Sequence, residues 1–210
     1  MSNRVCGHDW LASWMPRAGC LAAVLLASAC GGSTAAPSPA ALHAEIGDPA
    51  GDALPDPSDR TSPDLVHGTI DVSNNTLTVA VKFAPGAFDP ATTRLTVQLD
   101  TDQNASTGVR AGNLGVEYII DLFASTGQAS VLKAVPAGAC TSTAPCYVQS
   151  STAPLSVAAD GMTVTLPLSA IGSSDGRLLF RVLSYLSMPG LSSAVDDAMP
   201  DMTLAPAHVP

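Results

Sequence analysis

The chain has 210 residues, a formal net charge of −9 and 46% hydrophobic residues. Nucleic acids and anionic lipid surfaces attract clustered Lys and Arg, so this composition argues against both as direct partners, whereas it permits divalent cations. Both tryptophans, Trp10 and Trp14, lie near the N-terminus. Sugar-binding sites commonly stack aromatic rings on their ligands, so the lack of Trp in the rest of the chain weakens a carbohydrate role.

The N-terminal segment has the pattern of an export signal. Arg17 precedes the apolar run AGCLAAVLLASA, which ends in small residues. A basic start, a short apolar stretch and a small-residue cleavage site predict a secretory signal over residues 1–29, with Met15 as an alternative true start. The run is too short for a membrane span, which needs about 20 apolar residues.

Cys30 follows the small residues Ala27, Ser28 and Ala29 directly. This arrangement resembles the lipobox of bacterial lipoproteins, which implies cleavage before Cys30 and attachment of lipid such as palmitate to that cysteine. Leucine is usual three residues before the cysteine, where this chain has Ala27. Cleavage after Ala29 by an ordinary signal peptidase therefore stays open as the alternative.

The domain organisation follows from these signals. Residues 30–45 hold the lipidated cysteine and a Ser/Pro/Ala tether, STAAPSPAA, that has no apolar pattern to bury. Residues 46–210 are long enough for a single core. We therefore expect an exported protein held on the bacterial cell envelope, at the outer membrane or the cell surface, through a lipid anchor.

From Asp64 onward the hydrophobic pattern has a period of two, which is typical of half-buried strands. In TLTVAVKF, for example, Leu77, Val79 and Val81 share one face. Turn signals separate the runs, with Ser73-Asn74-Asn75 and Asp160-Gly161 the clearest. The expected strands are 65–72, 76–83, 94–99, 116–124, 129–135, 155–159, 162–168 and 177–186.

No window predicts a helix longer than a turn or two, and the best candidate is Leu168 to Gly172, between two strands. About eight short strands with Gly, Pro, Asn and Asp connections predict an all-β fold, an antiparallel β-sandwich. A closed barrel is the alternative.

Cys140 and Cys146 remain after the three N-terminal cysteines are set aside. An oxidising compartment favours a disulfide between them, as a clip on one loop. Metal binding is the competing interpretation, although two cysteines without nearby histidines make a poor zinc site.

The segment LDTDQNASTGV places Asp100, Asp102 and Asn104 at alternate positions after an expected strand. Calcium prefers about 6–8 oxygen ligands, which such a loop supplies in part. The loop is not an EF-hand, because Gly is missing at its sixth position and Glu at its twelfth. In DPAGD, Asp48 and Asp52 are available to complete the shell, together with Asp64 or Asp197. The alternative is a polar turn, since Asp and Asn side chains bond readily to nearby backbone.

The motif order DPAGD, PDLVHGTIDVSNNTLTVAVKF, LDTDQNASTG, GVEYIIDL, VTLPLSAIG and DDAMPD resembles the bacterial DOMON-like domains and their relatives, the family 9 carbohydrate-binding modules. The resemblance implies a jelly-roll-like sandwich that binds a ligand and often holds a structural calcium ion.

Motifs that carry catalysis, such as G-x-S-x-G, H-E-x-x-H and the phosphate-binding G-x-x-x-x-G-K, are absent from the sequence. We therefore expect a non-catalytic, lipid-anchored extracytoplasmic binding module rather than an enzyme, with a glycan or an envelope protein as partner. The alternative is a structural accessory protein of an envelope complex, and a glycan-active hydrolase is a more distant one.

Overall fold

The computed structural model describes residues 41–55, 61–136, 139–140, 145–173, 175–186 and 194–210. The expected signal segment, Cys30 and nearly all of the tether lie outside these residues. The described residues belong to one compact unit. None of their helices is long and apolar enough to cross a membrane.

The described part of the chain consists of strands and two single-turn 3-10 helices, and every strand pairing in it is antiparallel. This confirms the predicted all-β antiparallel fold, with more strands than the expected eight. The strands are β1 Leu42–Gly47, β2 Leu65–Ser73, β3 Thr76–Phe83, β4 Thr93–Asp100, β5 Val109–Ala111, β6 Leu114–Val116, β7 Tyr118–Phe123, β8 Gln128–Ala134, β9 Tyr147–Val157, β10 Gly161–Pro167, β11 Leu178–Leu186, β12 Asp197–Met199 and β13 Ala207–Val209, and the 3-10 turns are η1 Ala124–Thr126 and η2 Leu168–Ile171.

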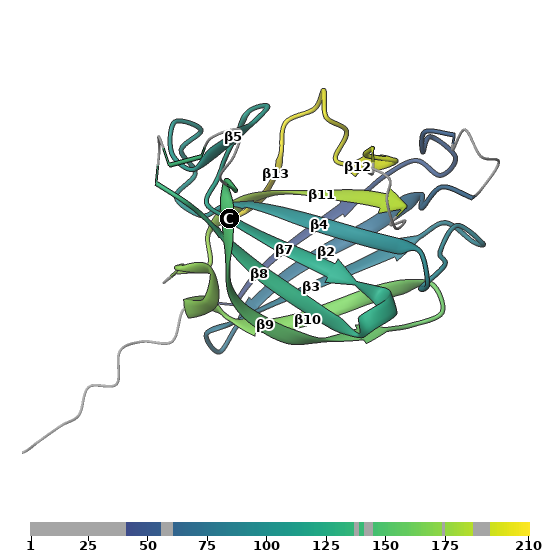
Figure 1. The fold of residues 1–210 in the computed structure, drawn as a ribbon, viewed down its shortest axis with the longest axis horizontal. Helices are drawn as coiled ribbons and strands as arrows, with labels where there is room; N and C mark the ends of the chain where they lie inside the picture. Colours follow the sequence, from purple (N-terminus) through teal and green to yellow (C-terminus); the bar gives the residue numbers. More distant parts are fainter. Residues whose placement is uncertain (1–40, 56–60, 137–138, 141–144, 174, 187–193) are drawn as a thin grey trace, which may run out of the picture. The chain divides into compact units, whose positions relative to one another are not determined.

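The strands form two layers that share one long strand. One layer has the order β1-β2-β3-β10 and the other β8-β7-β4-β11, with β12 and β13 both on the outer edge of β11. The first part of β9 pairs with β8, and its last residues, Leu155 to Val157, pair with β10. Figure 1 shows β4, β7 and β8 crossing in front of β2 and β3. The fold is therefore a sandwich whose layers are continuous through β9.

The core lies between these layers and contains the alternate residues that the sequence pattern places on one face. Strand β3 contributes Leu77, Val79 and Val81, and each is almost fully buried. The inward residues of β4, β7 and β11 meet them, because one face of each sheet must exclude water. Fully buried members are Leu95, Val97, Leu99, Ile120, Leu122, Phe180 and Val182.

The predicted turns are present. Asn74 and Asn75 have φ values of 50° and 61° between β2 and β3, and asparagine tolerates this left-handed region better than most residues. The single helical turn expected from Leu168 is η2, on the connection from β10 in one layer to β11 in the other.

At the side of the sandwich away from β9 lies the seam, which we define as the gap between β1 and β2 of one layer and β12 and β13 of the other. Strand β12 contacts β2, and β13 contacts β1. Within the described ranges, no backbone ladder joins these strands across the seam. The amide of Leu65 crosses it by donating to Asp197 Oδ2 at 2.7 Å. The Leu54 amide also donates to the Asp196 carbonyl at 2.7 Å, so isolated hydrogen bonds rather than a ladder connect the two layers here.

Candidate metal clusters and binding pocket

Three carboxylates meet where β4 ends and β7 begins, and we call Asp100, Asp102 and Glu117 the loop cluster. One oxygen atom from each lies within 4.8 Å of the others. Asp100 is the last residue of β4 and is fully buried. Asp102 follows in the exposed loop, and Glu117 stands directly before β7. The cluster thus forms at one end of two paired strands, β4 and β7.

Hydrogen bonds within the loop hold its two aspartates in place. Asp100 Oδ1 accepts a hydrogen bond from the Asn104 amide at 3.0 Å, and Asp100 Oδ2 accepts one from the Gly115 amide at 3.1 Å. The Thr107 hydroxyl contacts both carboxylate oxygens of Asp102 at 2.9 Å. The predicted turn chemistry, side chain to backbone, is therefore present in this loop.

The Asn104 side chain belongs to the turn. Its Oδ1 accepts the amide of Ser106 at 3.1 Å, two residues further along the chain. Glu117 is the third carboxylate that the fold supplies to Asp100 and Asp102. The sequence pattern predicts Asn104 as the third ligand, and its signal for Glu117 is only an isolated acidic residue in the apolar stretch from Leu114 to Ile120.

Glu117 has one satisfied and one unsatisfied oxygen. Its Oε2 accepts the amide of Thr101 at 2.9 Å, whereas Oε1 is buried without a hydrogen-bond partner. Burial is the main cause that raises the pKa of both Glu117 and Asp100. An oxygen-only donor set with an unpaired buried oxygen fits a hard divalent cation.

A pocket of about 710 Å³ adjoins the loop cluster and shares Glu117 with it. Loop residues Ser106 to Gly108 form part of its wall, and the remaining wall comes mainly from the strands β7, β8 and β9 and the segments next to them. The Lys133 ammonium lies 5.9 Å from the centre of the Tyr118 ring, and both residues line the pocket. The pocket therefore combines apolar walls with one acidic and one basic group.

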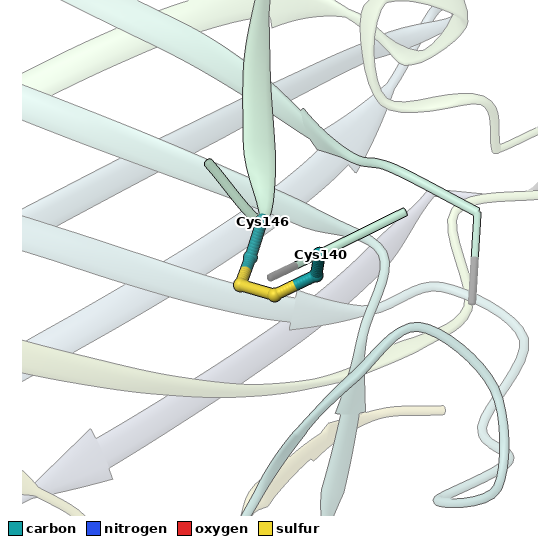
Figure 2. The surroundings of a disulfide bond; sticks show 2 residues. All are labelled: Cys140 and Cys146. Carbon is teal, nitrogen blue, oxygen red and sulfur yellow. A yellow bond between two sulfur atoms is a disulfide. The ribbon is translucent and has the colours of Figure 1, made fainter. Parts of the chain in front are cut away.

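The disulfide expected between Cys140 and Cys146 is formed (Figure 2). The two Cα atoms are 4.5 Å apart, within the range that a disulfide requires. The amide of Val135, a pocket residue, donates to the carbonyl of Cys146 at 2.9 Å. The bridge thus clips the connection that precedes β9, as predicted.

A second acidic group lies at the seam. One oxygen from each of Asp48, Asp52 and Asp197 lies within 4.8 Å of the others, and Asp64 is close enough to raise the pKa of both Asp48 and Asp197. We call these four residues the seam cluster. Asp197 accepts the amides of Leu65 and of its own neighbour Ala198, each at 2.7 Å.

The structure divides the five predicted metal ligands between these places. Asp100 and Asp102 belong to the loop cluster, Asp48 and Asp52 to the seam cluster, and Asn104 to the turn. On β11, Leu179 pairs with Asp100 and Ser184 with Asp197. Five residues at about 3.3 Å each separate the clusters by roughly 17 Å, so they do not form one coordination shell.

Burial and the neighbouring aspartates Asp197, Asp52, Asp201 and Asp64 raise the pKa of Asp48 from 3.8 to about 7. The folded value lies above the unfolded one, so the stability that protonated Asp48 contributes is present below about pH 4 and is lost as the pH rises through 7. In chelator, the melting midpoint of the wild type should therefore fall between pH 5 and pH 8 more steeply than that of Asp48→Asn. An equal pH dependence of the melting midpoint in the two proteins would contradict the raised pKa of Asp48.

No protein-family model matches this chain, and no curated protein sequence matches it.

Proposed function

We propose that this chain is a non-catalytic, lipid-anchored extracytoplasmic binding module whose ligand occupies the pocket beside Tyr118. The observation that carries the proposal is the position of that pocket on a rigid sandwich, next to the loop cluster. Ligand sites are typically concave and mostly apolar with a few fixed polar groups. Here Glu117 and Lys133 are those groups, and Tyr118, Pro136 and Val148 supply apolar surface.

A glycan or glycan-like polymer suits this pocket as a ligand class. The Lys133 ammonium lies 5.9 Å from the centre of the mostly buried Tyr118 ring and supplies a hydrogen-bond donor, and Glu117 Oε2 supplies an acceptor. Burial, and the nearby Glu117 carboxylate, raise the pKa of Tyr147, next to Val148, to about 12. Its phenol is protonated at neutral pH, as that of an ordinary tyrosine is, and Tyr147 itself does not line the pocket.

In this proposal calcium occupies the loop cluster in a structural role. Asp100, Asp102 and Glu117 would hold it, with the buried Oε1 of Glu117 as the oxygen that otherwise has no partner. Ser106, Thr107 and Gly108 of the same loop line the pocket. An ion that orders the loop therefore also orders this part of the pocket wall. Calcium accepts the irregular oxygen geometry that such a loop offers.

The anchor and the location of the proposed module rest on the N-terminal sequence. The apolar run before Cys30 and the small residues around the cleavage site support export and lipid attachment to the cell envelope. The motif order that resembles DOMON-like and family 9 carbohydrate-binding domains supports a binding role.

A pocket-blocking variant tests the proposed function. Val148 lines the pocket and is 49% exposed, so Val148→Trp should fill the pocket without disturbing the core. Val157 lies on the same strand, is 37% exposed and does not line the pocket, which makes Val157→Trp the matched control. On columns of immobilised bacterial envelope polysaccharides, the wild type and Val157→Trp should be retained, and retention of Val148→Trp should fall at least tenfold.

Equal retention of the two Trp variants would overturn the pocket as the ligand site. If the wild type passes every column unretained, the glycan class is excluded, and the accessory protein of an envelope complex becomes the better account. Release of cleaved sugar from a column would instead favour a glycan-active hydrolase.

A further inference from the structure

The seam cluster joins two parts of the chain that are far apart in sequence, the connection from β1 to β2 and the start of β12. Asp48 and Asp52 belong to the loop after β1, Asp64 directly precedes β2, and Asp197 is the first residue of β12. The connection from β1 to β2 belongs to one layer of the sandwich, and β12 belongs to the other. The carboxylates therefore face one another across the seam, where no ladder connects the described strands.

Two buried oxygens of this cluster have no hydrogen-bond partner. These atoms are Asp64 Oδ1 and Asp48 Oδ2. Asp64 is only 7% exposed, and its other oxygen, Oδ2, accepts the amide of Gly51 at 2.7 Å. Gly51 lies between Asp48 and Asp52, so the Asp64 carboxylate is directed into the cluster. Burying a carboxylate oxygen without a partner costs free energy. A bound ligand that contacts these two oxygens would explain why they are buried.

The described residues offer these carboxylates no compensating positive charge. The ion pairs in this part of the chain involve His43, His67 and Arg94, and their acidic partners are Glu45, Asp71 and Asp121. Asp48, Asp52 and Asp197 lie within this short range, with Asp64 beside them, so their like charges repel one another, most strongly at buried Asp197. A bound cation removes both the repulsion and the two unpaired oxygens at once.

We propose that the seam cluster (Asp48, Asp52, Asp64 and Asp197) is a second divalent-cation site, separate from the loop cluster. A cation bound there would hold the two layers together across the seam. The chemistry of the donor atoms favours calcium as this cation. All donors are oxygens, their spacing is set by the β1–β2 connection and by β12, and exposed Asp52 leaves room for water ligands. Magnesium demands a nearly ideal octahedron at shorter distances, which such an assembly supplies less well.

This proposal does not depend on the function of the pocket. Its test measures the number of calcium ions bound per chain, by equilibrium dialysis of the purified full chain in mild detergent against radioactive calcium. The variants are Asp48→Asn combined with Asp52→Asn for the seam cluster, and Asp102→Asn for the loop cluster. Asp160→Asn, in an exposed turn outside both clusters, is the matched control.

We expect the seam double variant to bind one calcium fewer than the wild type and the Asp160→Asn control. It should also unfold at a higher temperature than the wild type in chelator, because two of the repelling charges are gone, and it should gain less from calcium. This reversal separates a lost cation site from a damaged fold, which would lower the midpoint in both conditions.

Several results would overturn the second site. One is a seam double variant with the same stoichiometry as the wild type, and another is calcium binding abolished by Asp102→Asn alone, which would leave only the loop site. A chain that binds no calcium would overturn both sites. Binding that is lost in the seam variant and kept in Asp102→Asn would support the seam site while contradicting calcium in the loop cluster.

Discussion

Replacing Gly115 with Ala should destabilise the protein by roughly 3 kcal/mol, as expected for a side chain forced into a filled space. Gly115 lies in β6 and is buried, and its amide donates to Asp100 Oδ2. An added Cβ would come too close to the backbone oxygens of Asn104 and Thr107. These atoms belong to a loop closed by its own hydrogen bonds, so either the loop or the strand must move.

The same substitution should also weaken calcium binding and ligand binding. Moving the loop displaces Asp102 from Asp100 and Glu117, and it also shifts Ser106 and Thr107 in the pocket wall. We therefore expect Gly115→Ala to lose one of the bound calcium ions and most of the retention on the polysaccharide columns. Thermal melting together with calcium dialysis measures both effects.

Gly47→Ala is the control for this prediction. Gly47 ends β1, and a Cβ built there meets nothing within 4 Å. Its effect on the free energy of unfolding should stay within about 0.5 kcal/mol, as for most surface substitutions. A Gly115→Ala protein as stable as Gly47→Ala, with full calcium binding, would show that the loop is not packed as described.

The sequence pattern predicted those parts of the fold in which one face of a strand is buried. Alternation in β3 and β4 identified both strands and their inward residues, because the core accepts apolar side chains on one side only. It missed the first part of β9, from Tyr147 to Pro154, where the side chains on both faces are largely exposed. It also missed β1, β5, β6, β12 and β13, most of which are too short to show a period.

Local spacing predicted part of each metal cluster and could not predict how the parts combine. Asp100 and Asp102 are two residues apart, and their convergence depends only on the loop. Glu117 joins them because β7 pairs with β4, and Asp197 meets Asp48 because β12 lies across the seam from β2. These contacts are set by strand order, which single-sequence patterns do not reveal.

In the proposed module, calcium in the loop cluster holds the wall of the binding pocket in place. Calcium bound at the seam would also raise the melting midpoint and would obscure the effect of calcium in the loop cluster. The test therefore uses the variant with both Asp48→Asn and Asp52→Asn. Extracellular calcium modules bind with dissociation constants of about 10⁻⁴ M and above. At about 100 times that concentration, a site of this affinity stabilises the native state by about 2.7 kcal/mol.

The most direct measurement is the melting midpoint of this double variant in about 10 mM calcium, a concentration set by that affinity range, and in chelator. A shift of roughly 5–10 °C corresponds to the expected free energy for a chain of this length. Magnesium at the same concentration should produce a much smaller shift, and adding Asp102→Asn should remove the calcium effect. Identical midpoints in calcium and in chelator would contradict the account.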